Sequence, residues 1–127
     1  NSKTLAQTFM DSGCKLITNG TENHMMVMNT IESFGIDGTV AEHTLDEISI
    51  STNKQVIPDD PNPPFTPSGI RLGTPTATTR GMKEDDMVQI GNWMIDALKN
   101  YENSDYLHQL QEDVEVFCRQ FPVPGLA

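Results

Sequence analysis

The chain has 127 residues and a net charge of −10, because 18 acidic side chains outnumber 8 basic ones. That length is typical of one domain. The acidic excess argues against a nucleic-acid partner, since phosphate binding needs clustered lysines and arginines. No apolar run approaches the roughly 20 residues that cross a bilayer, so no membrane partner is predicted.

In the first half of the chain the pattern predicts helices separated by two short strands. Ser2 can cap a helix that Gly13 would end. "CKLIT" and "HMMVMN" read as strands, because turn-forming residues separate them. "DGTVAEHTLDEIS" places its apolar residues at helical spacing.

The second half begins with "ISISTNKQVI", which predicts a short strand leading into a loop. The loop "PDDPNPPFTP" holds five prolines in ten residues and excludes a helix or a central strand. A strand containing Arg71 follows, then a helix from Glu84 and a last helix capped by Ser104. This order predicts an α+β fold in which helices cover one face of a small, mostly antiparallel sheet.

Cysteines and histidines give no sign of a metal site. Cys14 and Cys118 form no CxxC pair, which favours reduced thiols in a cytoplasmic protein. His24, His43 and His108 lack ligand spacing among themselves or with the cysteines.

Arg71 is the residue that most suggests a binding site. In a strand, Ile70 and Leu72 point to one face, and Gly69, Arg71 and Gly73 point to the other. Glycines in a strand often mark the approach of a ligand or of another backbone. A guanidinium on such a strip predicts an anion site, and its planar donors match a carboxylate.

Other interpretations of this region stay open at this point. Arg71 could instead form an internal ion pair with Asp59, Asp60 or Glu47. "GTPTATTRG" matches neither common phosphate-loop motif. Lys54 has neither an apolar surrounding nor a cationic neighbour in the local sequence, so we interpret it as a solvated lysine and not as a Schiff-base lysine.

Several segments also resemble one enzyme family. "SGIRLGTPTATTRGM" resembles, almost residue for residue, the C-terminal domain signature of serine hydroxymethyltransferases. "NGTENHMMV", "STNKQVIPDDPNPPF" and "FPVPG" resemble further segments of the family in the same order. The resemblance covers essentially the whole chain. Gln55 stands where the family usually has asparagine, Glu22 where it has aspartate and Pro67 where it has threonine.

The resemblance implies that residues 1–127 are the C-terminal small domain of a fold-type-I enzyme that uses pyridoxal phosphate. The family converts serine and tetrahydrofolate to glycine and methylenetetrahydrofolate, and a homodimer or homotetramer is expected. By the same resemblance, Arg71 grips the substrate carboxylate. Residues expected at the folate site are Asn53, Gln55, Pro63, Pro64 and Phe65.

No residue here is expected to act in catalysis or to bind the cofactor, because the large domain would carry the Schiff-base lysine. We therefore expect the isolated chain to be inactive. Two alternatives remain from the sequence. One is a non-catalytic domain that binds a small molecule or a partner, and the other is the small domain of a threonine aldolase or an aminotransferase.

Overall fold

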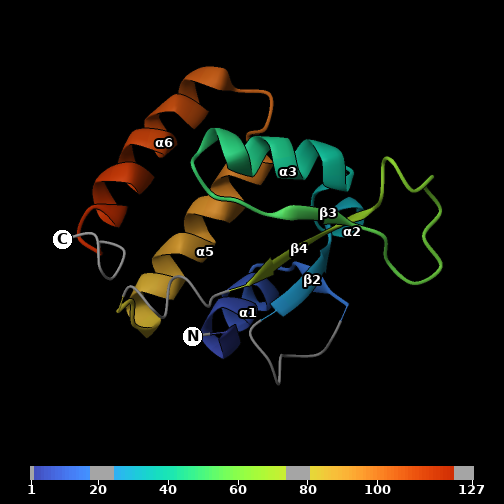
Figure 1. Ribbon diagram of the computed structural model, residues 1–127, viewed down its shortest axis with the longest axis horizontal. Coiled ribbons are helices and arrows are strands. Elements are labelled where there is room, and N and C mark those ends of the chain that lie inside the picture. Colours follow the sequence, from blue (N-terminus) through green and yellow to red (C-terminus); the bar gives the residue numbers. More distant parts are fainter. Residues whose placement is uncertain (1, 18–24, 74–80, 122–127) are drawn as a thin grey trace.

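The computed structural model describes residues 2–17, 25–73 and 81–121 (Figure 1). Pairs of short strands are separated by helices along the chain, which agrees with the predicted α+β fold. The elements are α1 (Ser2–Asp11), β1 (Lys15–Leu16), β2 (Met25–Asn29), α2 (Thr30–Phe34), α3 (Gly38–Glu47), β3 (Asn53–Gln55), β4 (Gly69–Gly73), α5 (Glu84–Lys99) and α6 (Ser104–Cys118). Among these helices, none has the length and apolar character needed to span a membrane.

The strands form one antiparallel sheet in the order β1-β2-β4-β3. β4 is therefore an inner strand, with β2 on one side and β3 on the other. The β2–β4 pairing sets Val27 opposite Arg71 and Met28 opposite Ile70. The antiparallel sheet confirms the prediction from the sequence.

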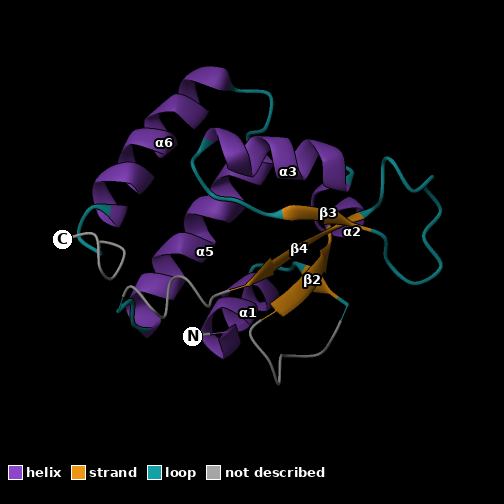
Figure 2. Cartoon of the chain, viewed as in Figure 1, coloured by secondary structure: helices purple, strands orange, loops and turns teal. Residues whose placement is uncertain are grey.

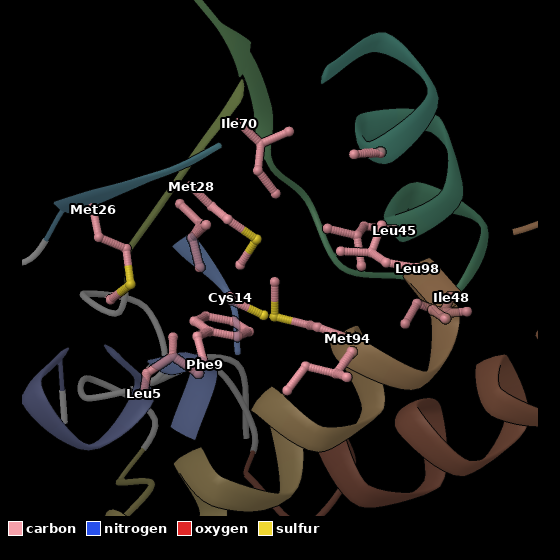
Figure 3. Close-up of a cluster of buried hydrophobic side chains, with 14 of the residues drawn as sticks. Leu5, Phe9, Cys14, Met26, Met28, Leu45, Ile48, Ile70, Met94 and Leu98 are labelled. Atoms are coloured by element: carbon pink, nitrogen blue, oxygen red, sulfur yellow. The ribbon is translucent and has the colours of Figure 1, made fainter. Parts of the chain in front are cut away.

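The hydrophobic core lies against one face of this sheet. Met26, Met28 and Ile70 have exposed fractions of 2%, 0% and 0%. Figure 3 shows these side chains on the same side as Phe9 of α1 and Met94 of α5. Helices α1, α3 and α5 gather on that side, and α6 lies farther out against α3 and α5 (Figure 2).

Local capping explains where the helices begin, and it corrects two details of the prediction. Asn29 ends β2 and accepts a hydrogen bond from the Glu32 N–H at 3.0 Å, which starts the short helix α2 that the sequence reading missed. Gly35 ends α2 with φ of 74°. The cap of α6 is Asn103, which accepts from the Tyr106 N–H at 3.1 Å; Ser104 is already the first helical residue.

Candidate functional site

Arg71 lies in the middle of β4, between two core residues. Ile70 and Leu72 have exposed fractions of 0% and 5%, whereas Arg71 is exposed. Because side chains alternate along a strand, the guanidinium lies on the sheet face opposite the core. The predicted alternation is confirmed.

The register of β3 brings two amide side chains to the same face. Asn53 lies directly opposite Arg71, and Gln55 lies opposite Gly69. Directly opposed residues have Cβ atoms about 4.5–5.5 Å apart, and long side chains also reach the diagonal neighbour. The side chain of Lys54 belongs to the opposite face of β3, and its backbone N–H donates to Glu42 Oε2 at 2.9 Å. The open face therefore combines one guanidinium with two amides.

The acidic residues considered as partners of Arg71 are engaged elsewhere or lie beyond reach. Glu47 pairs with His43 at 3.2 Å, and Asp60 accepts hydrogen bonds from its own loop. In residues 2–17, 25–73 and 81–121, no carboxylate oxygen lies within 4.0 Å of the Arg71 guanidinium. The internal ion pair is therefore not the role of this arginine within the described chain.

At Gly69 the strand glycine marks the approach of other parts of the chain and not an open space for a ligand. An ideal Cβ on Gly69 would lie 2.8 Å from Ile57 Cγ2 and 2.8 Å from the Met28 carbonyl oxygen. The N-terminus of α3 also touches this point, because a Cβ on Gly38 would overlap the Gly69 carbonyl oxygen. The glycine thus permits close packing of backbone on backbone. Gly73 is paired with Met25 at the edge of the described residues.

The proline-rich loop between β3 and β4 is ordered by the carboxylate of Asp60. Its Oδ1 accepts from Ser68 Oγ at 2.6 Å and from the Asn62 N–H at 2.9 Å. Its Oδ2 accepts from the Ser68 N–H at 2.9 Å and from the Ile57 N–H at 3.3 Å. The Ser68 hydroxyl, aided by the three N–H donors, lowers the pKa of Asp60 to about 2. This role of Asp60 was not predicted from the sequence.

The residues predicted for the folate site occupy the outer part of the same loop. Pro63 and Pro64 are exposed, and Phe65 has an exposed fraction of 72%. Thr39 Oγ1 of α3 donates to the Phe65 carbonyl oxygen at 3.3 Å. The loop leaves β3 after Gln55 and extends beyond the sheet (Figure 1). An exposed aromatic ring beside two prolines suits a flat, partly apolar ligand.

The described residues do not form a complete pyridoxal phosphate site. A Schiff-base lysine needs desolvation or a cationic neighbour to lower its pKa. Every lysine of the chain is exposed, including Lys54 beside the open face. No lysine of the described residues therefore has an environment that would activate it toward the cofactor.

The described part of the chain contains no cluster of candidate metal ligands and no disulfide. No group of three or more potential ligands among His, Cys, Asp and Glu meets there. Cys14 and Cys118 are free thiols, and burial raises the pKa of Cys14 to about 11. His43 is exposed on α3, and His24 lies outside the described residues. Residues 74–80 of "GTPTATTRG", which matches neither common phosphate-loop motif, lie outside them as well.

Together these features define an α+β domain that presents one arginine and two amides on the open face of an antiparallel sheet, a surface suited to a carboxylate ligand. The chain belongs to the serine hydroxymethyltransferase family, whose model matches residues 1–94. It is 42% identical over 123 residues to the serine hydroxymethyltransferase of Koribacter versatilis (strain Ellin345). That alignment covers 97% of the chain and 29% of the relative.

Family membership decides between the enzyme classes that the sequence left open. The family is a transferase family that uses pyridoxal phosphate and tetrahydrofolate, so the threonine aldolase and aminotransferase alternatives are set aside. The chain spans only 29% of the relative's length.

Proposed function

We propose that residues 1–127 form the C-terminal small domain of a cytoplasmic serine hydroxymethyltransferase. The complete enzyme interconverts serine plus tetrahydrofolate and glycine plus 5,10-methylenetetrahydrofolate, in one-carbon metabolism and glycine biosynthesis, and acts as a homodimer or homotetramer. Pyridoxal phosphate supplies the electron sink when it is bound, and the large domain supplies its lysine.

Arg71 binds the α-carboxylate of serine or glycine. The observation that carries this role is an exposed guanidinium, on an inner strand, with no carboxylate of the described chain in ion-pair distance. Two parallel N–H donors fix a carboxylate in one plane, which a single charge does not. The resulting restriction of the substrate's rotation is an orientation effect on the reaction.

Asn53, Gln55, Pro63, Pro64 and Phe65 form the folate side of the site. The amides of β3 lie in the same sheet face as Arg71, and the loop begins where β3 ends. This arrangement gives the carboxylate and the folate neighbouring positions on one continuous stretch of chain. Gln55 donates one N–H of Nε2 to the Val56 carbonyl oxygen at 3.0 Å, which leaves its second N–H and its Oε1 for a folate.

The test is the replacement Arg71→Lys in the full-length enzyme. Loss of a charged hydrogen bond costs about 1.5–3 kcal/mol, so kcat/KM for serine should fall roughly ten- to hundredfold. Arg119→Lys is the matched control, because Arg119 is also exposed but lies at the C-terminal end of α6 and not in the sheet. Unchanged kcat/KM for serine in the Arg71 variant would show that this arginine does not bind the substrate.

The isolated chain should be inactive, because its lysines are not activated for imine formation. All are exposed, so none has the environment that activates an amine toward the cofactor. Titration of the chain with micromolar pyridoxal phosphate should give no imine absorbance band. A saturable band at one equivalent would contradict this assignment of the lysine to the large domain.

A further inference from the structure

Asp60 joins three separate points of the loop through one carboxylate. Its donors are the backbone of Ile57 at the start of the loop, Asn62 at its turn and Ser68 at its end. Both oxygens accept two hydrogen bonds, at 2.6 and 2.9 Å for Oδ1 and at 2.9 and 3.3 Å for Oδ2. The exposed segment with Pro63 and Phe65 lies between the second and third of these points.

The same network leads directly into the strand that carries Arg71. Ser68 is almost fully buried, with an exposed fraction of 1%. Its carbonyl oxygen accepts from the Thr30 N–H at 2.9 Å and from Thr30 Oγ1 at 3.0 Å. β4 begins at the next residue, Gly69, two positions before Arg71. A displacement of Ser68 is therefore transmitted to the loop and to the arginine strand at once.

The neighbouring aspartate makes no comparable contacts. Asp59 is exposed, and within the described chain its carboxylate accepts no hydrogen bond. Its φ of 56° lies in the left-handed region, which asparagine also tolerates. Asp59 is thus a matched control of the same residue type in the same loop.

We propose that Asp60 is a positioning residue that holds the proline-rich loop and the start of β4 in the relative placement that tetrahydrofolate and the substrate carboxylate require. This inference rests on the proposed function. The low pKa of Asp60 supports it, since the carboxylate is ionised at any pH at which the enzyme would work.

Asp60→Asn in the full-length enzyme is the most direct test. An amide has a single acceptor oxygen, so in either orientation its NH₂ group faces at least one backbone N–H that the carboxylate now accepts, from Asn62 or from Ser68 and Ile57. KM for tetrahydrofolate should rise roughly ten- to hundredfold, because small displacements of positioning groups have effects of this size. Asp59→Asn should leave this KM unchanged.

Ser68→Ala provides a second, milder variant, in case Asp60→Asn does not fold. It removes only the hydroxyl donor at 2.6 Å and keeps the three backbone bonds. We expect a smaller rise in the same KM, with kcat less affected than KM. The second measurement is amide hydrogen exchange at Ile57, Asn62 and Ser68, which should be faster in Asp60→Asn and unchanged in Asp59→Asn.

The outcomes separate the two proposals. Suppose that the wild-type enzyme transfers the hydroxymethyl group, that both loop variants fold, and that their KM for tetrahydrofolate stays within about twofold of wild type. This result overturns the positioning role of Asp60 alone. Faster exchange together with unchanged KM has the same meaning, because the loop is then loosened without consequence for folate. A wild-type enzyme without hydroxymethyl transfer contradicts the proposed function, and the role of Asp60 falls with it.

Discussion

Gly38→Ala should destabilise the fold at the contact between α3 and β4. The added methyl group would overlap the Gly69 carbonyl oxygen and lie 2.9 Å from the Pro67 carbonyl oxygen. Neither oxygen can turn away as a side chain does. Gly69 is paired with strands on both sides, and Pro67 accepts the Gly38 N–H at 2.6 Å. Relief requires α3 to move off the sheet as a unit.

The magnitude follows from two opposing contributions. Overpacking of this kind costs about 1–3 kcal/mol and occasionally more. Alanine regains up to about 1 kcal/mol of helix propensity over glycine, less at the first residue of a helix. Since the obstacle at Gly38 is backbone, we expect the upper part of the range and a net loss of about 2 kcal/mol or more.

Gly91→Ala in α5 is the matched control. Its methyl group would lie 2.9 Å from Thr8 Cγ2 and 3.2 Å from Leu5 Cδ1. These obstacles are side-chain atoms and not backbone, with Thr8 Cβ following at 3.3 Å. Alanine also improves the propensity of a helix interior by about 0.8–1.0 kcal/mol. We therefore expect the unfolding free energy of this variant to stay within about 1 kcal/mol of wild type.

Urea unfolding followed by tryptophan fluorescence measures both variants. The only tryptophan, Trp93, is half-buried in α5 and meets the Phe117 ring edge-on at 5.2 Å, so its emission should report the packing of the helices. With an m-value of about 1–3 kcal/mol/M, Gly38→Ala should lower the midpoint by roughly 1 M. A midpoint shift no larger than that of Gly91→Ala would refute the reasoning from backbone overlap.

Two further predictions use neighbouring or buried side chains. Ile70→Ala should lower the unfolding free energy by about 2–5 kcal/mol, whereas Arg71→Ala should change it by no more than about 0.5 kcal/mol. Equal losses for the two variants in urea unfolding would contradict a sheet with the core on one face only. The pKa of Cys14 is raised from 9.0 to about 11, so the folded state holds this proton more tightly and stability falls as pH rises from about 9 toward 11. Urea midpoints across that range should fall less steeply in Cys14→Ala, and an equal slope would contradict the assignment.

Local patterns were sufficient to predict most elements and the exposed Arg71. Period-two alternation in β4 and helical spacing in α3 are properties of neighbouring residues, and each was confirmed by burial. The missed helix α2 also left a local sign. Asn29 and Gly35 stand at its two ends as typical capping residues, but the preceding strand residues led us to assign Asn29 to a strand only.

The contacts that position the site could not be read from the sequence in the same way. Gly69 packs against the start of α3, 31 positions earlier by the numbers of Gly38 and Gly69, and glycine alone does not distinguish that contact from empty space. Asp60 gathers donors from Ile57, Asn62 and Ser68 only after the loop has closed. Such contacts depend on the tertiary fold, and no periodicity in the sequence predicts them.

In the proposed site, the substrate carboxylate binds to a strand, and the folate binds to a loop that Asp60 holds in place. β4 is held on both sides by β2 and β3, so the backbone of Arg71 is fixed before any ligand arrives. An exposed arginine also carries no desolvation cost that an internal acid would have to offset. The chain has 18 acidic residues, yet Arg71 has no carboxylate partner among the described residues. Its guanidinium is therefore available to the carboxylate of a ligand. The loop around Phe65 has no ladder of its own, and the carboxylate of Asp60 supplies the order that strand pairing gives to Arg71.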